Sequence, residues 1–422
     1  MKDDLQKLTE RLLSAARKAG AEAADAVALN DAAVSIDVRQ GKLEQAERAE
    51  STEIGLRVIV GRKQACVASS DLSDQTIAQM AERAVLMARE APEDATVGLA
   101  DPSEIARDWD LAAFDLCDPA DEPGAAALEA DARTAEAAAL GVPGVTMPES
   151  ASASYRHRRV HMAATNGFSG AYARTSRSIS AVAISGEGLT MERDWAAESR
   201  VYQSDLPDPT EVGLLAGQRA AGRAGPRKPR TGAYPVVYDE RIASGVIGHL
   251  MAAVNGSSIV RGSSWLRDAL GQQVLPAGLS VVEDPHRPRI SGSRPFDDEG
   301  LATRRREVVA DGVLTGWTLD LGTARRLGMQ STASAGRGLS SPPSPSVSNI
   351  ALTQGTRTRA DLIAEMGTGL LITSLIGSTI NPTTGDYSRG ASGFWVESGE
   401  IVYPVNEVTI AGNLRDMLMR IT

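Results

Sequence analysis

The order of helical and strand-like segments repeats in the first half of the chain, and this repeat restricts the fold more than any other feature. In residues 1–91 a helical pattern precedes several alternating strand patterns and a second helical pattern, and the same order returns at 122–224. Gly41 and Gly167 mark matching hairpin turns. One copy alone buries little apolar surface, so the two copies are expected to share one sheet with helices on one face. We therefore predict a duplicated helix–antiparallel-sheet domain at residues 1–225.

A run of glycine, proline and basic residues, Gly225 to Arg230, has the composition of a linker. Beyond it, residues 231–422 mix short strand patterns with short helical patterns, which is typical of a mixed α/β domain. The chain as a whole is predicted to be an α+β protein of two domains. Within the second domain, the Gly/Ser/Pro-rich segment at 336–348 is expected to be a mobile loop.

Composition and charge exclude several classes of function. The formal net charge is −10 at pH 7, so the chain gains little from phosphate counterion release and nucleic-acid binding is disfavoured. Cys66 and Cys117 form no CxxC pair, which favours a reducing compartment. The N-terminus lacks the apolar segment of a signal peptide, and no apolar run approaches the roughly 20 residues of a membrane helix. We expect a soluble cytoplasmic protein that contacts neither membrane nor nucleic acid.

An amphipathic helix is predicted within Asp239–Val254, directly after a short apolar strand. Apolar residues at every fourth position define one buried face, namely Ile242, Val246, Leu250 and Val254. His249 lies one turn after Gly245. Three roles are open for His249: a ligand, the remnant of a lost site, or a packed residue. The apolar spacing of the helix favours the packed residue.

Three other patterns each have a functional and a structural interpretation. His157 and His161 have a spacing used by metal ligands, although on a strand they share one face of a sheet that we expect to be exposed. The acidic run Asp297-Asp298-Glu299 suits a cation site or a turn. Gly336-Arg337-Gly338 lacks the Lys-Ser/Thr of a phosphate-binding loop. The structural interpretation is favoured in each case.

The most distinctive stretch of the second domain is Thr384 to Glu397, which reads TGDYSRGASGFWVE. Further distinctive stretches are Ile247 to Leu250, Pro295 to Gly300, Glu365 to Leu370, Tyr403 to Val405 and Ile410 to Leu414. In these stretches the chain resembles the TldD/PmbA family, and within it the PmbA (TldE) branch. The second domain resembles the family in its amino-acid sequence, whereas the first resembles it in the arrangement of its helices and strands.

The resemblance implies a system of two subunits. In the TldD branch a helix with the motif HExxxH binds a metal, expected to be zinc, and cleaves peptides, and the PmbA branch pairs with it. In this chain the first histidine position is Ser244, the glutamate position is Gly245 and the second histidine position is His249. A zinc hydrolase needs imidazole ligands and a carboxylate base. We therefore expect no metal or cofactor in this chain and zinc in a TldD-type partner.

The expected function is that of a non-catalytic subunit of a cytosolic metallopeptidase complex that trims peptide precursors and degrades small unfolded proteins. Substrate contacts are predicted on one strand, at Asp386, Ser388, Arg389, Gly390 and Phe394. There an extended peptide is expected to pair by strand addition, with Arg389 holding a carboxylate. An ordinary strand with Arg389 in an internal salt bridge is an equally good interpretation.

Two other functions remain open from the sequence. The first is a regulatory or binding homodimer without protease activity, which predicts no TldD-type partner. The second is a hydrolase with a site of its own at Asp297, Asp298 or Glu299.

Overall fold

The computed structural model describes residues 2–422. Six long strands of the first half form one antiparallel sheet in the order β3-β2-β1-β4-β5-β6. Their bounds are β1 Ala23–Arg39, β2 Lys42–Val60, β3 Lys63–Ser69, β4 Val145–Ala164, β5 Ser169–Ser185 and β6 Glu192–Arg200. The two repeats meet where β1 pairs with β4, so they share one sheet.

Turn geometry explains the long β1–β2 hairpin. Gln40 and Gly41 both have positive φ, 53° and 69°, as in the two-residue turns that match the twist of a hairpin. Gly167, with a φ of 98°, lies in the turn between β4 and β5. Both hairpin turns therefore lie where the sequence indicated them.

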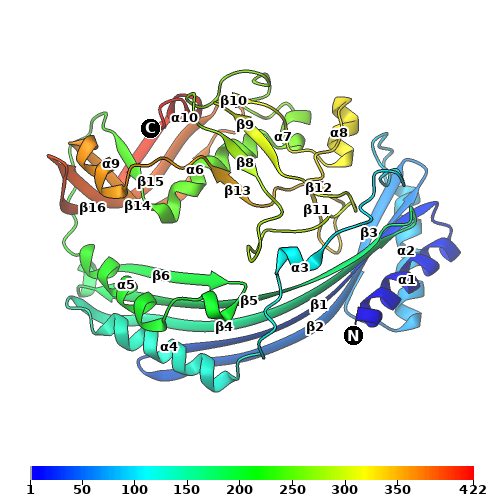
Figure 1. Ribbon diagram of the computed structural model, residues 1–422, viewed down its shortest axis with the longest axis horizontal. Helices are drawn as coiled ribbons and strands as arrows, with labels where there is room; N and C mark the ends of the chain where they lie inside the picture. Colours follow the sequence, from blue (N-terminus) through cyan, green and yellow to red (C-terminus); the bar gives the residue numbers. More distant parts are fainter. Residues whose placement is uncertain (1) are drawn as a thin grey trace.

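Four helices cover one face of this sheet, α1 (Lys2–Ala19), α2 (Asp74–Glu90), α4 (Ala125–Leu140) and α5 (Pro209–Gly222). On β1, residues 24, 26 and 28 pack in the core of α1 and α2, whereas residues 34, 36 and 38 pack in the core of α4. Alternate residues of a strand share a face, so both helix groups lie on the same side of the sheet. Figure 1 shows them along its outer side.

The second domain is built around a four-stranded mixed sheet of order β16-β15-β14-β7, in which only the β14–β7 pair is parallel. The strands are β7 Val236–Tyr238, β14 Gly369–Ile380, β15 Asp386–Glu397 and β16 Glu400–Asn413. Helix α6 (Glu240–Ala253) packs on this sheet, and Leu250 and Val254 are fully buried. Strands and helices thus occur in both halves, and the α+β prediction is confirmed.

Smaller elements complete the chain. A second sheet has the order β10-β9-β8-β13, with β8 Val281–Glu283, β9 Arg306–Ala310, β10 Val313–Leu314 and β13 Ile350–Leu352. The short strands β11 (Ala335–Gly336) and β12 (Ser344–Pro345) form a hairpin. The remaining helices are α3 Leu111–Phe114, α7 Gly256–Val260, α8 Leu321–Leu327, α9 Arg359–Met366 and α10 Leu414–Leu418, with 3₁₀ turns at Gly188–Thr190 and Gln203–Asp205.

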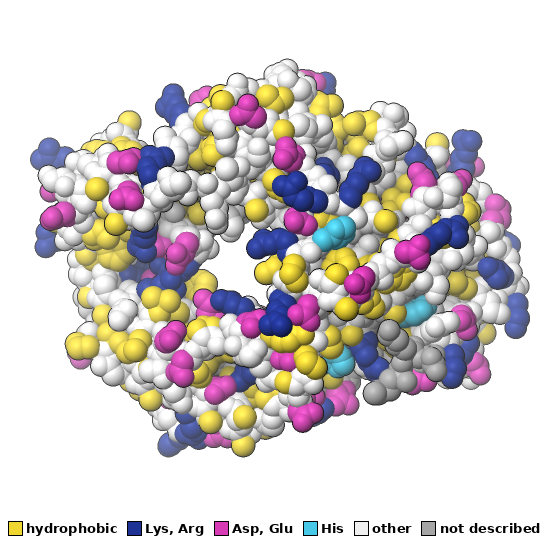
Figure 2. All heavy atoms as spheres, viewed as in Figure 1, with side chains coloured by type: hydrophobic (Ala, Val, Ile, Leu, Met, Phe, Trp, Pro, Cys, Tyr) yellow, Lys and Arg dark blue, Asp and Glu magenta, His cyan; other side chains and the backbone are white. Residues whose placement is uncertain are grey.

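The second domain lies over the face of the large sheet that the helices leave free (Figure 1). At one end an aromatic cluster joins them, and the Phe296 ring lies 5.0 Å from the rings of Trp109 and Phe168. At the other end Arg241 of α6 forms an ion pair with Asp194 of β6 at 2.7 Å. Figure 2, in the same view, shows an opening through the molecule between the two domains.

The loop expected to be mobile is packed against the first domain. Arg337 forms an ion pair with Asp25, and the main chain at Leu339 lies directly over Gly55 of β2. Within residues 2–422, no helix has the length and apolar character needed to span a membrane.

Candidate functional site

Helix α6 carries the three positions that correspond to the metal-binding motif. Its N-terminus is fixed by the buried Asp239, whose carboxylate accepts the backbone N–H of Arg241. Ser244 is exposed on the helix surface. A Cβ at Gly245 would meet no atom within 4 Å, so the space beside this position is open. The helix therefore presents the Ser244 hydroxyl where the motif has its first histidine. At Gly245, where the motif has its glutamate, there is no side chain.

His249 packs against β15. Its ring lies edge-on to the Tyr387 ring, with centroids 5.8 Å apart and an interplanar angle of 71°. Burial, together with the positive charge of Arg389, lowers the pKa of His249 below its usual range. The imidazole is therefore neutral at pH 7 and lies beside a cation.

These residues do not fit a catalytic zinc ion. Such a site uses three protein ligands and a water, and His249 is the only imidazole on α6. The charge of Arg389 repels a cation at this position. Across residues 2–422 no group of three or more His, Cys, Asp or Glu side chains is arranged to hold a metal ion.

The proposed substrate residues lie along one strand and do not form one pocket. Asp386 and Phe394 are eight residues apart on β15, a separation of roughly 25 Å. Asp386 accepts hydrogen bonds from the Thr384 hydroxyl and the Asn413 amide, so it stabilises a turn. Phe394 packs in a small apolar cluster with the buried Leu371 and Val396.

Among the predicted substrate residues, Arg389 has a guanidinium group that remains available to bind a ligand. It is half-buried, its Nε has no hydrogen-bond partner, and no carboxylate within residues 2–422 forms an ion pair with it. The internal salt bridge that the sequence allowed is therefore not formed. By strand alternation Arg389 lies on the same face of β15 as Tyr387, whereas Ser388 and Gly390 lie on the other face.

The backbone of β15 is not available for strand addition. It pairs with β14 on one side and with β16 on the other along its length. The prediction that the main chain of an extended peptide pairs with β15 at Ser388 to Gly390 is therefore wrong. The outer strands of this sheet are β16 and β7. On the β7 side an unpaired edge of β14 is also present, because β7 pairs only with residues 370–372, and in the described part of the chain no strand pairs with that edge at 374–380. Strand patterns alone do not show which strand is central.

The acidic run forms a turn, as the structural interpretation had it. Asp297 is fully buried and its carboxylate accepts the backbone N–H groups of Glu299, Leu301 and Ala335. Burial nevertheless raises the pKa of Asp297 to about 6. Asp298 accepts the backbone N–H of Arg337. Glu299 lines a cavity between the two domains.

The two histidines of β4 do not form a metal site. Four residues of strand separate them by about 13 Å, too far to bind one ion together. His161 is buried beneath α1 and its Nδ1 lies 2.9 Å from the Thr9 hydroxyl. The expectation of an exposed face is thus wrong for His161, because α1 covers this end of the strand.

Three family models match the chain. The PmbA/TldA metallopeptidase domain 1 matches residues 24–88, the central domain matches 118–224, and the C-terminal domain matches 231–422. Metalloprotease PmbA of Escherichia coli is 38% identical over 91% of this chain and 83% of that protein. A PmbA homologue of Haemophilus influenzae is 36% identical over 98% of this chain and 90% of that protein.

Solved structures share the arrangement of the whole chain. A Bacteroides thetaiotaomicron protein described as a modulator of DNA gyrase superposes with a TM-score of 0.90 at 26% identity, covering 98% of this chain and 92% of that one. TldE of Thermococcus kodakarensis superposes with a TM-score of 0.86 over 98% of this chain and 93% of that one. Its identity is 18%, so this likeness concerns the fold.

Proposed function

Because the chain belongs to the PmbA/TldD metallopeptidase family, we propose that it is a non-catalytic, TldE-like subunit of a cytosolic peptidase complex. A TldD-type partner supplies the zinc ion and the general base. The observation that carries the proposal is the chemistry of α6, where Ser244 and Gly245 provide neither an imidazole nor a carboxylate.

The surroundings of His249 support the same assignment. Its ring is held against Tyr387 and its neighbour Arg389 is a cation. A zinc ligand would instead have further anionic or neutral donors directed at the same point. His249 therefore packs the helix against the sheet.

We assign this subunit the binding of extended peptide. The free edge of β14 offers main-chain donors and acceptors to a chain that is not folded. Arg389 offers a guanidinium without a carboxylate partner, which suits the acidic group or C-terminus of a peptide. Peptide precursors and small unfolded proteins are extended substrates of this kind, and they enter the complex through such contacts.

The test compares three purified samples: this chain, a TldD-type subunit from the same organism, and their mixture. Zinc content is measured together with cleavage of an unstructured peptide. We expect no stoichiometric zinc and no cleavage with this chain alone, and cleavage with the mixture. Stoichiometric zinc together with activity in the isolated chain would overturn the proposal. A stable homodimer that binds peptide and recruits no TldD-type subunit from native extract would instead establish the regulatory function.

A further inference from the structure

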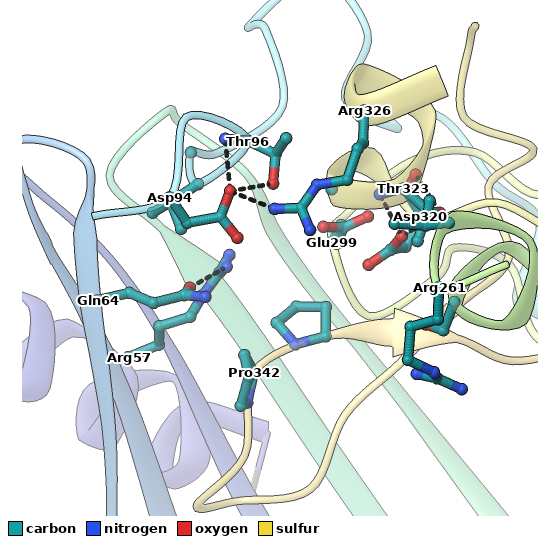
Figure 3. Close-up of a pocket in the computed structure, with 16 residues that line it drawn as sticks. Arg57, Gln64, Asp94, Thr96, Arg261, Glu299, Asp320, Thr323, Arg326 and Pro342 are labelled. Atoms are coloured by element: carbon teal, nitrogen blue, oxygen red, sulfur yellow. Dashed lines mark hydrogen bonds and ion pairs between the residues drawn. The ribbon is translucent and has the colours of Figure 1, made fainter. Parts of the chain in front are cut away.

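A cavity of about 350 Å³ lies between the two domains, and neither α6 nor β15 lines it. One wall comes from β2, β3 and the segment after α2, and the other from α7, α8, the turn at Glu299 and the loop at 342–343. Figure 3 shows side chains from both domains directed into this space. The cavity therefore forms only when the two domains are in contact.

One wall carries carboxylates without a cation. Glu299 accepts the backbone N–H of Leu321 at 2.8 Å, and Asp320 accepts that of Thr323 at 2.8 Å. Within residues 2–422 neither carboxylate forms an ion pair, and Figure 3 shows the two side by side. Burial and the charges of Asp297 and Asp320 raise the pKa of Glu299 to about 8. Burial therefore favours the protonated form of this carboxyl at pH 7, and the charge of Arg57 opposes this effect only in part.

On the opposite wall, Arg57 shares its carboxylate partner with a second buried cation. Arg57 donates to Asp25 at 2.5 Å, and Arg337 forms an ion pair with the same carboxylate. The two guanidinium groups are 5% and 1% exposed, so one carboxylate serves two buried cations. Arg57 also donates to Gln64 at 3.2 Å, which leaves further N–H groups available on the cavity side.

The cavity separates Arg57 from the two acidic groups of the other wall. No ion pair within 4 Å joins Arg57 to Glu299 or Asp320, although the charge of Arg57 acts on Glu299. At the rim, Arg326 is already paired with Asp94 at 2.8 Å, and Arg261 is exposed. A buried charge is stabilised by a close partner of opposite sign. A molecule that carries both charges supplies a partner to each wall.

We propose that this cavity binds a zwitterion with a free ammonium and a free carboxylate group, that is, a free α-amino acid or a dipeptide. The ammonium group lies against Glu299 and Asp320, and the carboxylate faces Arg57. Val97, Val260 and the proline pair at 342–343 provide apolar surface for the side chain. The volume suits a small molecule of this class. The proposal does not depend on the function assigned above, because α6 and β15 take no part in it.

Binding would couple the two domains, because each supplies one of the charged walls. A ligand that binds the folded state alone stabilises it by RT ln(1 + [L]/Kd), so the melting temperature rises with ligand concentration. We expect the amino acid to act as a small effector that favours the assembled arrangement of the domains.

The experiment measures binding to the full chain by calorimetry and by thermal unfolding. The probes are L-leucine and Leu-Leu, and the blocked controls are N-acetyl-leucine, which lacks the ammonium, and leucinamide, which lacks the carboxylate. We expect saturable binding and a higher melting temperature with leucine or Leu-Leu, and at least about tenfold weaker binding with each blocked analogue. Comparing leucine with Leu-Leu distinguishes the free amino acid from the dipeptide.

The variant Glu299→Gln keeps an acceptor for the Leu321 N–H and removes the charge. We expect it to weaken leucine binding by about tenfold or more, whereas Glu307→Gln on the exposed surface of β9 leaves binding unchanged. An ammonium beside Glu299 lowers the pKa of that carboxyl, so the wild-type chain releases a proton on binding at pH 7. This release appears as buffer-dependent heat and is absent in Glu299→Gln.

Three results would overturn the proposal. They are the absence of binding by leucine and Leu-Leu, equal binding of the blocked analogues, and unchanged affinity and proton release in a Glu299→Gln variant that unfolds cooperatively like the wild type.

Discussion

Arg337 of the second domain forms an ion pair with Asp25 of β1, 312 residues away in the chain. Asp25 also accepts a hydrogen bond from Arg57 of the neighbouring strand β2. A single carboxylate thus fixes the loop at 336–348 to two strands of the large sheet. All three side chains are almost fully buried, so the contact is protected from solvent screening.

Replacing Arg337 by methionine removes one of the two cations and keeps most of the side-chain volume. Asp25 retains Arg57, so the loss is that of a charged hydrogen bond, not of a whole buried pair. We expect the free energy of unfolding to fall by about 1–3 kcal/mol. Denaturant unfolding followed by circular dichroism measures this change.

The exposed Arg305→Met is the matched control for that variant, with an expected effect within about 0.5 kcal/mol. Equal stability of Arg337→Met and Arg305→Met would show that the contact with Asp25 contributes nothing to the closed arrangement.

Two glycines with opposite surroundings give a second prediction. At Gly55 a Cβ would collide with the carbonyl oxygen of Leu339, whereas at Gly245 it would meet no atom within 4 Å. Gly55→Ala should destabilise the protein by about 1–3 kcal/mol because the loop must move. Gly245→Ala lies in a helix interior and should stabilise it by about 0.5–1 kcal/mol.

Thermal unfolding of both variants tests this pair directly. If Gly55→Ala matched the wild type, the loop would not lie against β2 as described. A destabilising Gly245→Ala would mean that the space beside α6 is filled.

Local sequence patterns predicted the features that depend on neighbouring residues, namely the hairpin turns and the buried face of a helix. The hairpin turns at Gly41 and Gly167 follow from residues that tolerate positive φ, and the buried face of α6 follows from apolar spacing. The repeated order of elements predicted one sheet shared by the two halves, but not that β1 pairs with β4.

Those patterns could not predict contacts between segments that are far apart in the sequence. Nothing near His161 in the sequence indicates that α1 covers it, and nothing near Arg57 indicates that Glu299 lies across a cavity from it. The central position of β15 depends on the order of strands in the sheet, which strand propensity does not encode.

The raised pKa of Glu299 gives a third prediction, on the dependence of stability on pH. In the folded protein this pKa is about 8, whereas in the unfolded chain it is near the ordinary value of 4.5. Below about pH 4.5 both states hold the proton, and from there to pH 8 the unfolded state loses it first. Stability attributable to Glu299 therefore decreases as the pH rises through this range.

Glu299→Gln removes this penalty while keeping the hydrogen bond from Leu321. We expect the variant to be more stable than the wild type at pH 8 by on the order of 2–4 kcal/mol, and to differ little at pH 4.5. Denaturant midpoints across this range give the difference, and a pH-independent difference would contradict the raised pKa. Glu307→Gln serves as the control, since its carboxylate is exposed.

Arg389→Gln separates a binding role of this cation from a packing role. If the guanidinium holds a peptide carboxylate, affinity for a peptide with a free C-terminus should fall about tenfold or more, whereas an amide-capped peptide should bind both proteins equally. The same substitution removes the positive charge that lowers the pKa of His249, so that pKa should rise and can be followed by NMR titration. A rise in the His249 pKa with unchanged peptide affinity would leave Arg389 as a neighbour of the helix that takes no part in binding.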